Sequence, residues 1–302
     1  MQPLISIVIP LYNGSNYIEE ALKCALAQDY ERKEIVVVND GSTDDGAGRE
    51  ICMRYADRIT YLEKPNGGCA SALNYGIRAA KGTYISWLSH DDLYEPNKLS
   101  HQVEILNREG LDPENTLISN RGGLVDGEGK PLMHPSVAEN KQLDDIGFFQ
   151  YLLFHKCVNG CGLLIPKSVF EKGLYFDESM RFVLDWNLWL KMAGSGVGVY
   201  LDGAVLVKNR VHGGQITVKQ KDLHKVEAER TVEDLFVFLQ DKPIAFMKEL
   251  YYFAYATRKL CAKKIREDLK KRGQKVRFLR GFSMRLKNDI KKTAKRVYHA
   301  IR

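Results

Sequence analysis

The sequence predicts an α/β protein with a mostly parallel central sheet flanked by helices, followed by a basic helical C-terminal extension. Three observations lead to this prediction. Short β-branched runs alternate with amphipathic segments through residues 5–110, at the spacing of about 25 to 30 residues that a strand, a helix and the return to a parallel strand require. Polar residues follow each of these runs, and the chain is acidic up to residue 241 and strongly basic after it.

Four strand–helix units fill the N-terminal part of the chain. The first begins with the apolar run ISIVIP, and its helix has an Asn16/Glu19 pair that could cap its start. In the second unit, Ser42 and Thr43 are the candidate caps. The predicted strands are 5–10, 34–40, 59–64 and 83–89, and the predicted helices are 16–28, 42–56, 66–82 and 93–110. Four such units predict an open parallel sheet covered on both faces.

The second half of the chain is less regular. Residues 115–132 indicate a strand with an Asp-Gly turn, 143–156 an amphipathic helix, and 162–173 a strand that leads into a short helix. From about Lys219 the sequence is typical of helices. We therefore predict a domain of residues 1–218, with a first half of 1–110 and a second half of 111–218, and a helical basic extension of residues 219–302.

Polar residues gather where the four predicted strands end. They are Tyr12 and Asn13, Asn39 and Asp40, residues 66–68, and Asp91 and Asp92. Ligands of doubly wound sheets bind outside the carboxyl ends of the strands, so we expect these segments to line one crevice. Two adjacent carboxylates there suit Mg²⁺, which takes one or two carboxylates and fills its other positions with water and phosphate oxygens. On local sequence alone, either aspartate could instead cap the next helix.

Four segments of the sequence resemble the motifs of the family 2 glycosyltransferases, which are inverting enzymes with the Rossmann-like GT-A fold. The segments are SIVIPLYNGSNYIEEAL, EIVVVNDGSTDDG, NGGCASALNYGIRAAKGTYISWLSHDD and LDWNLWLKM, in the order and spacing typical of the family. The resemblance covers roughly residues 4–215. It implies an enzyme that transfers a sugar from a nucleotide-diphosphate donor, with a UDP-sugar preferred.

The resemblance also implies roles for the residues of the crevice. The expected nucleotide-sugar-binding residues are Pro10, Tyr12, Asn13, Asp40, Asn66, Gly67, Gly68, Asp91 and Arg210, and the expected metal ligands are Asp92 and His212. Asp40 would accept a hydrogen bond from a uracil N–H, and the two glycines would let the backbone approach the nucleotide. Asp92 would bind Mg²⁺ or Mn²⁺ bridging the diphosphate. The composition around Asp40 is also that of a common turn.

Asp185 is the candidate catalytic base in the same resemblance. An inverting displacement needs one carboxylate to take the proton of the acceptor hydroxyl. Asp185 could instead only cap the helix that it begins, and the two roles are compatible. Trp186 and Trp189, which follow it, would pack in the core or stack on sugars. Two positions depart from the family pattern, because Ser89 and Leu184 stand where relatives have further acids.

The C-terminal tail carries most of the positive charge. Residues 242–302 contain 20 Lys or Arg and 4 Asp or Glu, a net charge of +16, whereas residues 1–241 carry −9. From Leu279 onward, apolar residues recur mostly every three or four positions with Arg and Lys between them. This pattern predicts an amphipathic helix on an anionic membrane surface, where a polyprenyl-diphosphate-linked acceptor would present its sugar. The alternative is a packed helical hairpin with a solvated basic face.

The leading hypothesis is an inverting, metal-dependent hexosyl- or N-acetylhexosaminyl-transferase that extends a glycan or lipid-linked acceptor in cell-surface polysaccharide synthesis. Two alternatives stay open, a nucleic-acid-binding protein acting through the basic tail and an inactive relative that binds nucleotide. The acidic body and the lack of a known motif disfavour a nucleic-acid partner. A dinucleotide-dependent oxidoreductase is disfavoured because the turn PLYNGSNY lacks G-x-G-x-x-G.

No apolar run approaches the roughly 20 residues that span a bilayer, and the N-terminus has no signal-peptide pattern. We therefore expect a cytoplasmic protein, either free or bound peripherally to the cytoplasmic face of the inner membrane.

Overall fold

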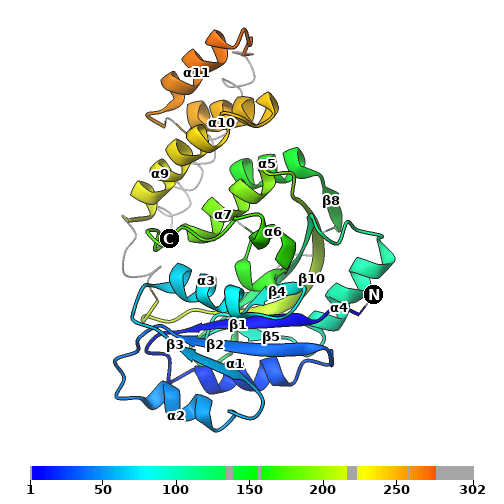
Figure 1. The fold of residues 1–302 in the computed structure, drawn as a ribbon, viewed down its shortest axis with the longest axis vertical. Helices are drawn as coiled ribbons and strands as arrows, with labels where there is room; N and C mark the ends of the chain where they lie inside the picture. The colour runs from blue at the N-terminus through cyan, green and yellow to red at the C-terminus, as the bar shows by residue number, and fades with distance from the viewer. Residues whose placement is uncertain (1, 134–138, 156–157, 216–222, 258, 277–302) are drawn as a thin grey trace.

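The computed structural model describes residues 2–133, 139–155, 158–215, 223–257 and 259–276. Within these residues a ten-stranded sheet forms the centre, and its main path runs β3-β2-β1-β4-β9-β6-β10-β5 (Figure 1). Its strands are β1 (Ile5–Leu11), β2 (Lys33–Asn39), β3 (Thr60–Glu63), β4 (Tyr84–Trp87), β5 (Leu93–Tyr94), β6 (Thr116–Val125), β7 (Pro131–Met133), β8 (Lys141–Leu143), β9 (Leu163–Pro166) and β10 (Gly198–Arg210).

The first four strands confirm the predicted strand–helix units. β1 pairs in parallel with both β2 and β4, so that Ile5 lies opposite Lys33 on one side and Tyr84 on the other. The helices of this half are α1 (Ile18–Leu26), α2 (Ala47–Met53), α3 (Cys69–Ala79) and α4 (Lys98–Arg108). All seven residues of β1 are buried, because helices cover both faces of a parallel sheet.

The predicted caps of the first two helices are wrong. α1 begins after Tyr17 and has no side-chain cap, although Asn16 and Glu19 have the sequence of a capping pair. Ser42 and Thr43 do not cap α2, because that helix begins only at Ala47, after Gly46, and the Gly48 N–H donates to Asp44 Oδ2 at 3.0 Å. Both predicted caps bond instead to Asn13 in the loop after β1; the Thr43 N–H donates to the Asn13 Oδ1 at 2.7 Å.

The second half adds strands of both directions to the sheet. β9 runs antiparallel to β4 and to β6 and so joins the two parallel groups. β6 and β10 pair in parallel, and β7 returns on β6 after the predicted turn. The helices here are α5 (Asp145–Phe154), the 3₁₀ helix η1 (Gly160–Gly162), α6 (Lys167–Glu171) and α7 (Leu184–Ala193). The predicted mostly parallel sheet flanked by helices is confirmed.

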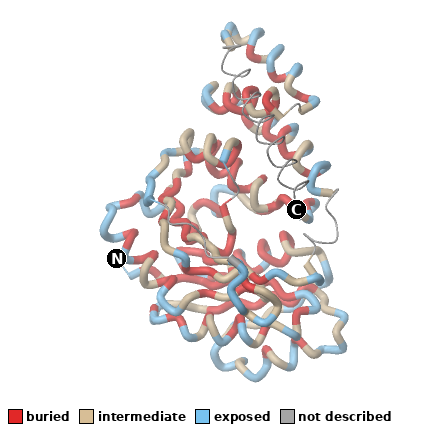
Figure 2. Tube along the Cα trace, turned by 180° about the vertical axis from the view of Figure 1, so that it is seen from behind, coloured by how far each residue is buried: buried red, intermediate tan, exposed pale blue. Residues whose placement is uncertain are grey.

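The two faces of the sheet bury separate hydrophobic clusters. Ile5, Ile7 and Ile9 of β1 face α1 and α4, whereas Val8 faces α3 and the cluster that includes α5 and α7. The buried residues accordingly follow the strands and the inner faces of the helices, and exposed residues lie around them (Figure 2). This alternation is the side-chain period of a strand covered on both sides.

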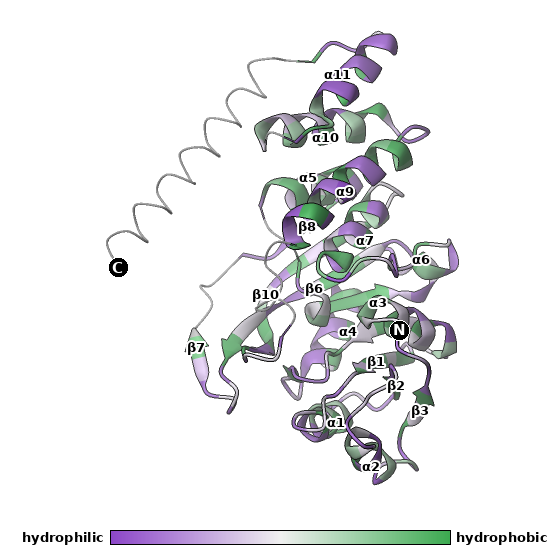
Figure 3. Ribbon diagram, turned by 90° about the vertical axis from the view of Figure 1, so that its left-hand side faces the viewer, coloured by the Kyte–Doolittle hydropathy of each residue, from purple (hydrophilic) through white to green (hydrophobic). Residues whose placement is uncertain are grey.

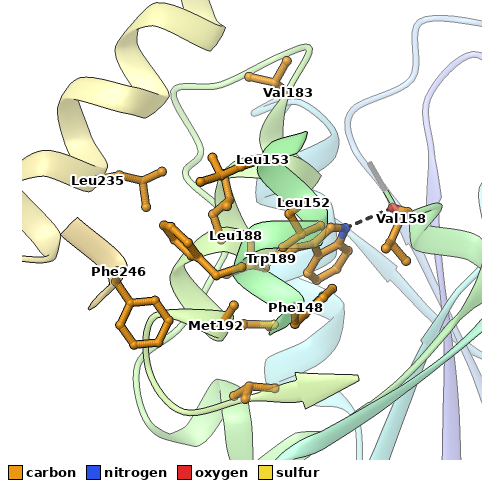
Figure 4. Packing of buried hydrophobic residues seen from close by; sticks show 14 of the residues in the cluster. Phe148, Leu152, Leu153, Val158, Val183, Leu188, Trp189, Met192, Leu235 and Phe246 are labelled. Carbon is orange, nitrogen blue, oxygen red and sulfur yellow. Dashed lines mark hydrogen bonds between the residues drawn. The ribbon is translucent and has the colours of Figure 1, made fainter. Parts of the chain in front are cut away.

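Three helices of the predicted extension follow, α9 (Leu223–Phe238), α10 (Ile244–Ala256) and α11 (Ala262–Lys271). They extend away from the sheet on the side of α5 and α7, and α11 is largely hydrophilic (Figures 1 and 3). Trp189 of α7 is completely buried, as predicted for a packing residue, and its indole N–H donates to the Val158 carbonyl at 3.2 Å (Figure 4). Leu235 of α9 and Phe246 of α10 belong to the same cluster, so the core of the second half continues into the extension.

The predicted boundary at residue 218 lies outside the described residues and stays a prediction. The predicted amphipathic helix from Leu279 lies outside them as well. In the part of the chain that the structure describes, none of the helices combines the length and the apolar character that crossing a membrane requires.

Candidate functional site

A cavity of about 360 Å³ lies outside the carboxyl ends of β1, β2 and β4, where the sequence predicted a crevice. It brings together eight of the predicted site residues. They are Pro10, Tyr12, Asp40, Asn66, Gly68, Asp91, Asp92 and His212. Asn13, Gly67, Arg210 and Asp185 do not line this cavity. Four segments that are distant in the sequence therefore meet at one end of the sheet, because parallel strands all end there.

Asp40 organises one wall of the cavity. Its carboxylate is almost completely buried and accepts hydrogen bonds from Lys64 Nζ at 2.7 Å and from the Gly67 N–H at 3.0 Å, both on Oδ1. The Gly68 N–H donates to Oδ2 at 2.6 Å. A carboxylate has about four acceptor positions, so one position on Oδ2 remains for a further donor. Lys64 balances the buried charge.

Asn13 and Gly67 support this wall from outside the cavity. Asn13 has a φ of 48° and ties the loop after β1 to Thr43, as described above. The Gly67 N–H is used on Asp40, and its carbonyl accepts a hydrogen bond from Arg181 Nη1 at 2.8 Å. Gly68 has a φ of 87°, and a Cβ at this position would collide with the Arg181 guanidinium. The positive φ favours glycine at this position, whereas the flexible Arg181 side chain could move away from a Cβ.

The adjacent aspartates have different surroundings. Asp92 is only 7% exposed, and its Oδ2 accepts from Asn209 Nδ2 at 2.9 Å and from the Cys161 thiol at 3.2 Å. Its Oδ1 accepts from the Arg210 N–H at 2.9 Å. Burial and then the negative charge of Asp91 raise the pKa of Asp92 to about 6. Asp92 thus holds the end of β10 against the loop after β4.

Asp91 pairs with the loop after β10. Its Oδ2 lies 3.0 Å from His212 Nε2 and accepts a hydrogen bond from Gln215 Nε2 at 3.1 Å. Burial raises the pKa of this carboxyl, but the neighbouring His90 and the hydrogen bonds from His212 and Gln215 outweigh it, so the pKa is lowered overall. Asp91 is therefore ionised at neutral pH, and its charge lies on the cavity wall.

Arg210 is buried, and each arm of its guanidinium has a protein partner. Nε donates to the Asp91 carbonyl at 2.9 Å, Nη1 to the Gly127 carbonyl at 2.7 Å, and Nη2 to Glu20 Oε2 at 2.8 Å. The guanidinium also lies 4.6 Å from the ring centre of Tyr17. In this arrangement Arg210 fixes the backbone of Asp91 and anchors it to α1.

The residues present fit a hard divalent cation. Asp91 and His212 place a carboxylate and an imidazole side by side on the cavity wall. Among the residues that the structure describes, no group of three or more His, Cys, Asp and Glu side chains could hold a metal ion. Mg²⁺ and Mn²⁺ accept few protein ligands when phosphate oxygens supply the rest. Asp92, the predicted ligand, accepts hydrogen bonds from protein donors on both of its carboxylate oxygens, and its role as a ligand stays a prediction. Asp91 beside it and the predicted His212 would hold the ion, and it would neutralise charge on a departing diphosphate.

Asp185 lies at the start of α7, beside this cavity. It lines a second cavity, whereas its neighbour Leu184 lines the first. Burial raises the pKa of the Cys69 thiol, on the wall of the first cavity, to about 12. Three carboxylates add to this effect, those of Asp40, Asp91 and Asp185. The candidate base therefore directly follows a residue that lines the first cavity.

The sequence analysis did not identify three further residues of the site. Arg181 lines the first cavity, and the indole N–H of Trp87 on the same wall is buried without an acceptor among the described residues. Glu227 of α9 accepts hydrogen bonds from three successive backbone N–H groups, those of residues 181–183 at 2.8, 2.8 and 3.0 Å. The only local signal was for Glu227, an acid at the same helical spacing as the buried Thr231 and Leu235.

Comparison with known proteins identifies related chains. Residues 6–161 match the family described as Glycosyl transferase family 2. An uncharacterized glycosyltransferase of Rickettsia typhi is 48% identical over 217 residues, which are 71% of this chain and 66% of the relative. The chain spans between 35% and 66% of the length of the Rickettsia relatives that it matches.

Two solved structures share the fold. S. aureus TarS 1–349 in complex with UDP matches with a TM-score of 0.64 and 16% identity, over 83% of this chain and 70% of that one. The mannosyltransferase PcManGT from Pyrobaculum calidifontis, in complex with GDP-Man and Mn²⁺, matches with a TM-score of 0.62 and 19% identity, over 90% and 76%. The shared architecture is the GT-A fold. With the family pattern running from β1 to the residues before β9, the chain belongs to the family 2 glycosyltransferases.

Proposed function

We propose that the chain is an inverting, metal-dependent glycosyltransferase that moves a sugar from a UDP-sugar to a glycan or lipid-linked acceptor in cell-surface polysaccharide synthesis. One observation carries this proposal. A single cavity is lined both by Asp40, which has one acceptor position left, and by the Asp91–His212 pair. The first can receive a base N–H, and the second can hold a cation on a diphosphate.

The reaction needs little from the protein beyond placement and one base. The acceptor hydroxyl oxygen attacks the anomeric carbon, the bond from that carbon to the diphosphate breaks, and the nucleoside diphosphate leaves. The hydroxyl proton passes to Asp185, which lies at the start of α7 and lines the second cavity, next to Leu184 of the first. When bound, Mg²⁺ or Mn²⁺ supplies positive charge for the leaving diphosphate. Arg181 also lines the first cavity and supplies a further positive charge there.

Neighbours of the same fold support a nucleotide-diphosphate donor, of which we propose a UDP-sugar. The S. aureus TarS structure contains UDP, and the PcManGT structure contains GDP-Man with Mn²⁺. A carboxylate at the position of Asp40 suits the N–H of uracil, although guanine also offers N–H donors. Binding of the two nucleotides therefore has to be compared directly.

The test is calorimetric titration of the protein with UDP, GDP and dTDP, with and without Mn²⁺. We expect UDP to bind most tightly and Mn²⁺ to strengthen binding at least about tenfold, because the ion neutralises part of the diphosphate charge. Asp91→Ala should lose the Mn²⁺ effect and keep the weaker metal-free binding. Asp40→Asn should lose both the Mn²⁺ effect and the metal-free binding of UDP. Asp57→Asn, at an exposed carboxylate, should match the wild type.

A separate variant tests the proposed base. Asp185→Asn should bind UDP as the wild type does and should lose release of UDP from a UDP-sugar in the presence of acceptor. Failure of all three nucleotides to bind the wild type would refute the transferase proposal, and full turnover by Asp185→Asn would refute the role of that residue.

We propose in addition that the basic tail binds the cytoplasmic face of the inner membrane. The net charge of +16 over residues 242–302 supports this, since each basic residue near an anionic surface contributes about 1 kcal/mol. Deletion of residues 274–302 should release the protein from vesicles of phosphatidylglycerol and phosphatidylcholine in a co-sedimentation assay. Equal sedimentation of the truncated and full chains would contradict the anchor.

A further inference from the structure

A second cavity, of about 460 Å³, opens beside the first. Its walls come from α5, α7, α9 and α10, which contact one another on the side of the sheet from which the extension projects (Figure 1). The residues that matter for the argument are Phe182, Asp185, Trp186, His224, Phe253 and Lys259. This volume is within the range of about 300 to 1,000 Å³ that small-molecule sites occupy.

One short segment separates the two cavities. Arg181 and Leu184 line the first cavity, whereas Phe182, Val183 and Asp185 line the second. Neighbouring residues of this segment thus line different cavities, and the candidate base Asp185 belongs to the segment that separates them. A group bound in the second cavity would therefore be next to Asp185 and close to a ligand bound in the first.

The walls of the second cavity are aromatic. The rings of Trp186 and Phe253 lie 5.9 Å apart at an angle of 60°, and those of Phe182 and His224 lie 5.2 Å apart at 82°. The Trp186 indole N–H donates to the Leu152 carbonyl at 3.1 Å, which fixes the ring. Lys259 contributes a charged group that is paired with Glu229 at 3.0 Å. The cavity therefore combines flat apolar surfaces with a few polar groups.

We propose that this second cavity binds a pyranose ring of the acceptor, with the attacking hydroxyl at Asp185. The proposal rests on the transferase function proposed above. A pyranose presents apolar C–H groups on its faces and hydroxyls around its edge, which matches aromatic walls with polar groups at Asp185, His224 and Lys259. The position of this cavity next to the first, across the 181–185 segment, is what selects the acceptor as occupant.

The proposal assigns the helical extension to the acceptor site. His224 comes from α9, Phe253 from α10, and Lys259 from the residues that follow α10. The buried Glu227 carboxylate of α9 also holds the backbone N–H groups of residues 181–183, directly before α7. The extension therefore closes the cavity and positions the segment that carries Asp185.

The test is saturation-transfer NMR with the full chain, UDP and Mn²⁺, and a panel of methyl glycosides of glucose, galactose, mannose and N-acetylglucosamine. We expect at least one glycoside to bind. Its affinity should fall about tenfold or more in Trp186→Leu and in Phe253→Leu, because each loses an aromatic face. His224→Ala, at an exposed position where folding is not at risk, should also weaken binding, and Val226→Ala, on the exposed face of α9, should not.

Titration of UDP into each variant separates the two proposals. We expect the affinity for UDP to stay within about twofold of wild type in all four variants, which also shows that they are folded. Failure of the wild type to bind UDP would refute the proposed transferase function itself. Normal UDP binding with no glycoside bound, or with a glycoside that binds the aromatic variants as tightly as the wild type, would overturn the acceptor cavity.

Discussion

Lys98, at the start of α4, makes the stability of the protein depend on pH in a specific direction. Its side chain is completely buried, and its amine donates to Ser86 Oγ at 3.0 Å and to Gln102 Oε1 at 3.1 Å. It also lies 4.2 Å from the ring centre of Tyr94. Burial lowers the pKa of this amine from 10.5 to about 7, because the charged form loses its hydration.

The sign and size of the effect follow from the two pKa values. At a pH between these two pKa values, Lys98 binds a proton in the unfolded chain but not in the folded protein. The free energy of unfolding therefore rises as the pH rises. From about pH 6 to about pH 8.5 the Lys98 contribution should add about 2 kcal/mol to the free energy of unfolding. Lys98→Met keeps the shape of the side chain and removes this contribution, although it leaves Ser86 and Gln102 without a donor.

Urea unfolding at several pH values tests this prediction. The free energy of unfolding of the wild type, relative to Lys98→Met, should rise with pH over this range by about 2 kcal/mol. Lys23→Met, on the exposed face of α1, serves as the control and should follow the wild type at every pH. Parallel pH profiles of the wild type and Lys98→Met would refute the reasoning, since the amine would then titrate alike in both states.

Three further predictions concern the contacts between the extension and the second half. Glu227→Ala leaves three backbone N–H groups unpaired and should lower the free energy of unfolding by about 3 to 5 kcal/mol. The stability of Glu227→Gln should lie between that of the wild type and that of Glu227→Ala. Equal urea midpoints for the two variants would contradict this prediction. The kcat of Glu227→Gln should fall while its affinity for UDP stays unchanged, as measured by turnover and calorimetry. Trp189→Ala should cost about 3 to 5 kcal/mol, and a loss below 1 kcal/mol in the same unfolding assay would show that its cluster can collapse.

The N-terminal half of the fold could be predicted because its signals are local. The run ISIVIP and the segments after it have the period of buried strands and amphipathic helices, and the structure has the four strand–helix units in the predicted order. The predicted helix 93–110 is wrong at its start, because Leu93 and Tyr94 form β5, which pairs with the distant β10, and α4 begins at Lys98. The antiparallel insertion of β9 between β4 and β6 was not predicted. Strand pairing depends on contacts between distant residues, and nothing in the four residues of β9 specifies their neighbours.

Part of the candidate site could likewise be predicted from the sequence, and part could not. The convergence of Asp40, Asp91 and Asp92 follows from their positions after parallel strands, so the sequence predicted it. The individual environments of these aspartates do not follow from their positions in the sequence. Asp92 bonds to Asn209, 117 residues away, while its neighbour Asp91 bonds to His212. Burial and the charge of Asp91 raise the pKa of Asp92, whereas His90, His212 and Gln215 lower the pKa of Asp91.

The sequence by itself determined the family, the order of strands and helices in the first half and the edge of the sheet where the site lies, because periodicity and motif spacing are properties of nearby residues. Only the tertiary structure decided that Glu227 of α9 holds the residues before Asp185 and that α9 and α10 close a second cavity beside it. These contacts join residues whose separation along the chain carries no period, and only the packing of the helices brings them together.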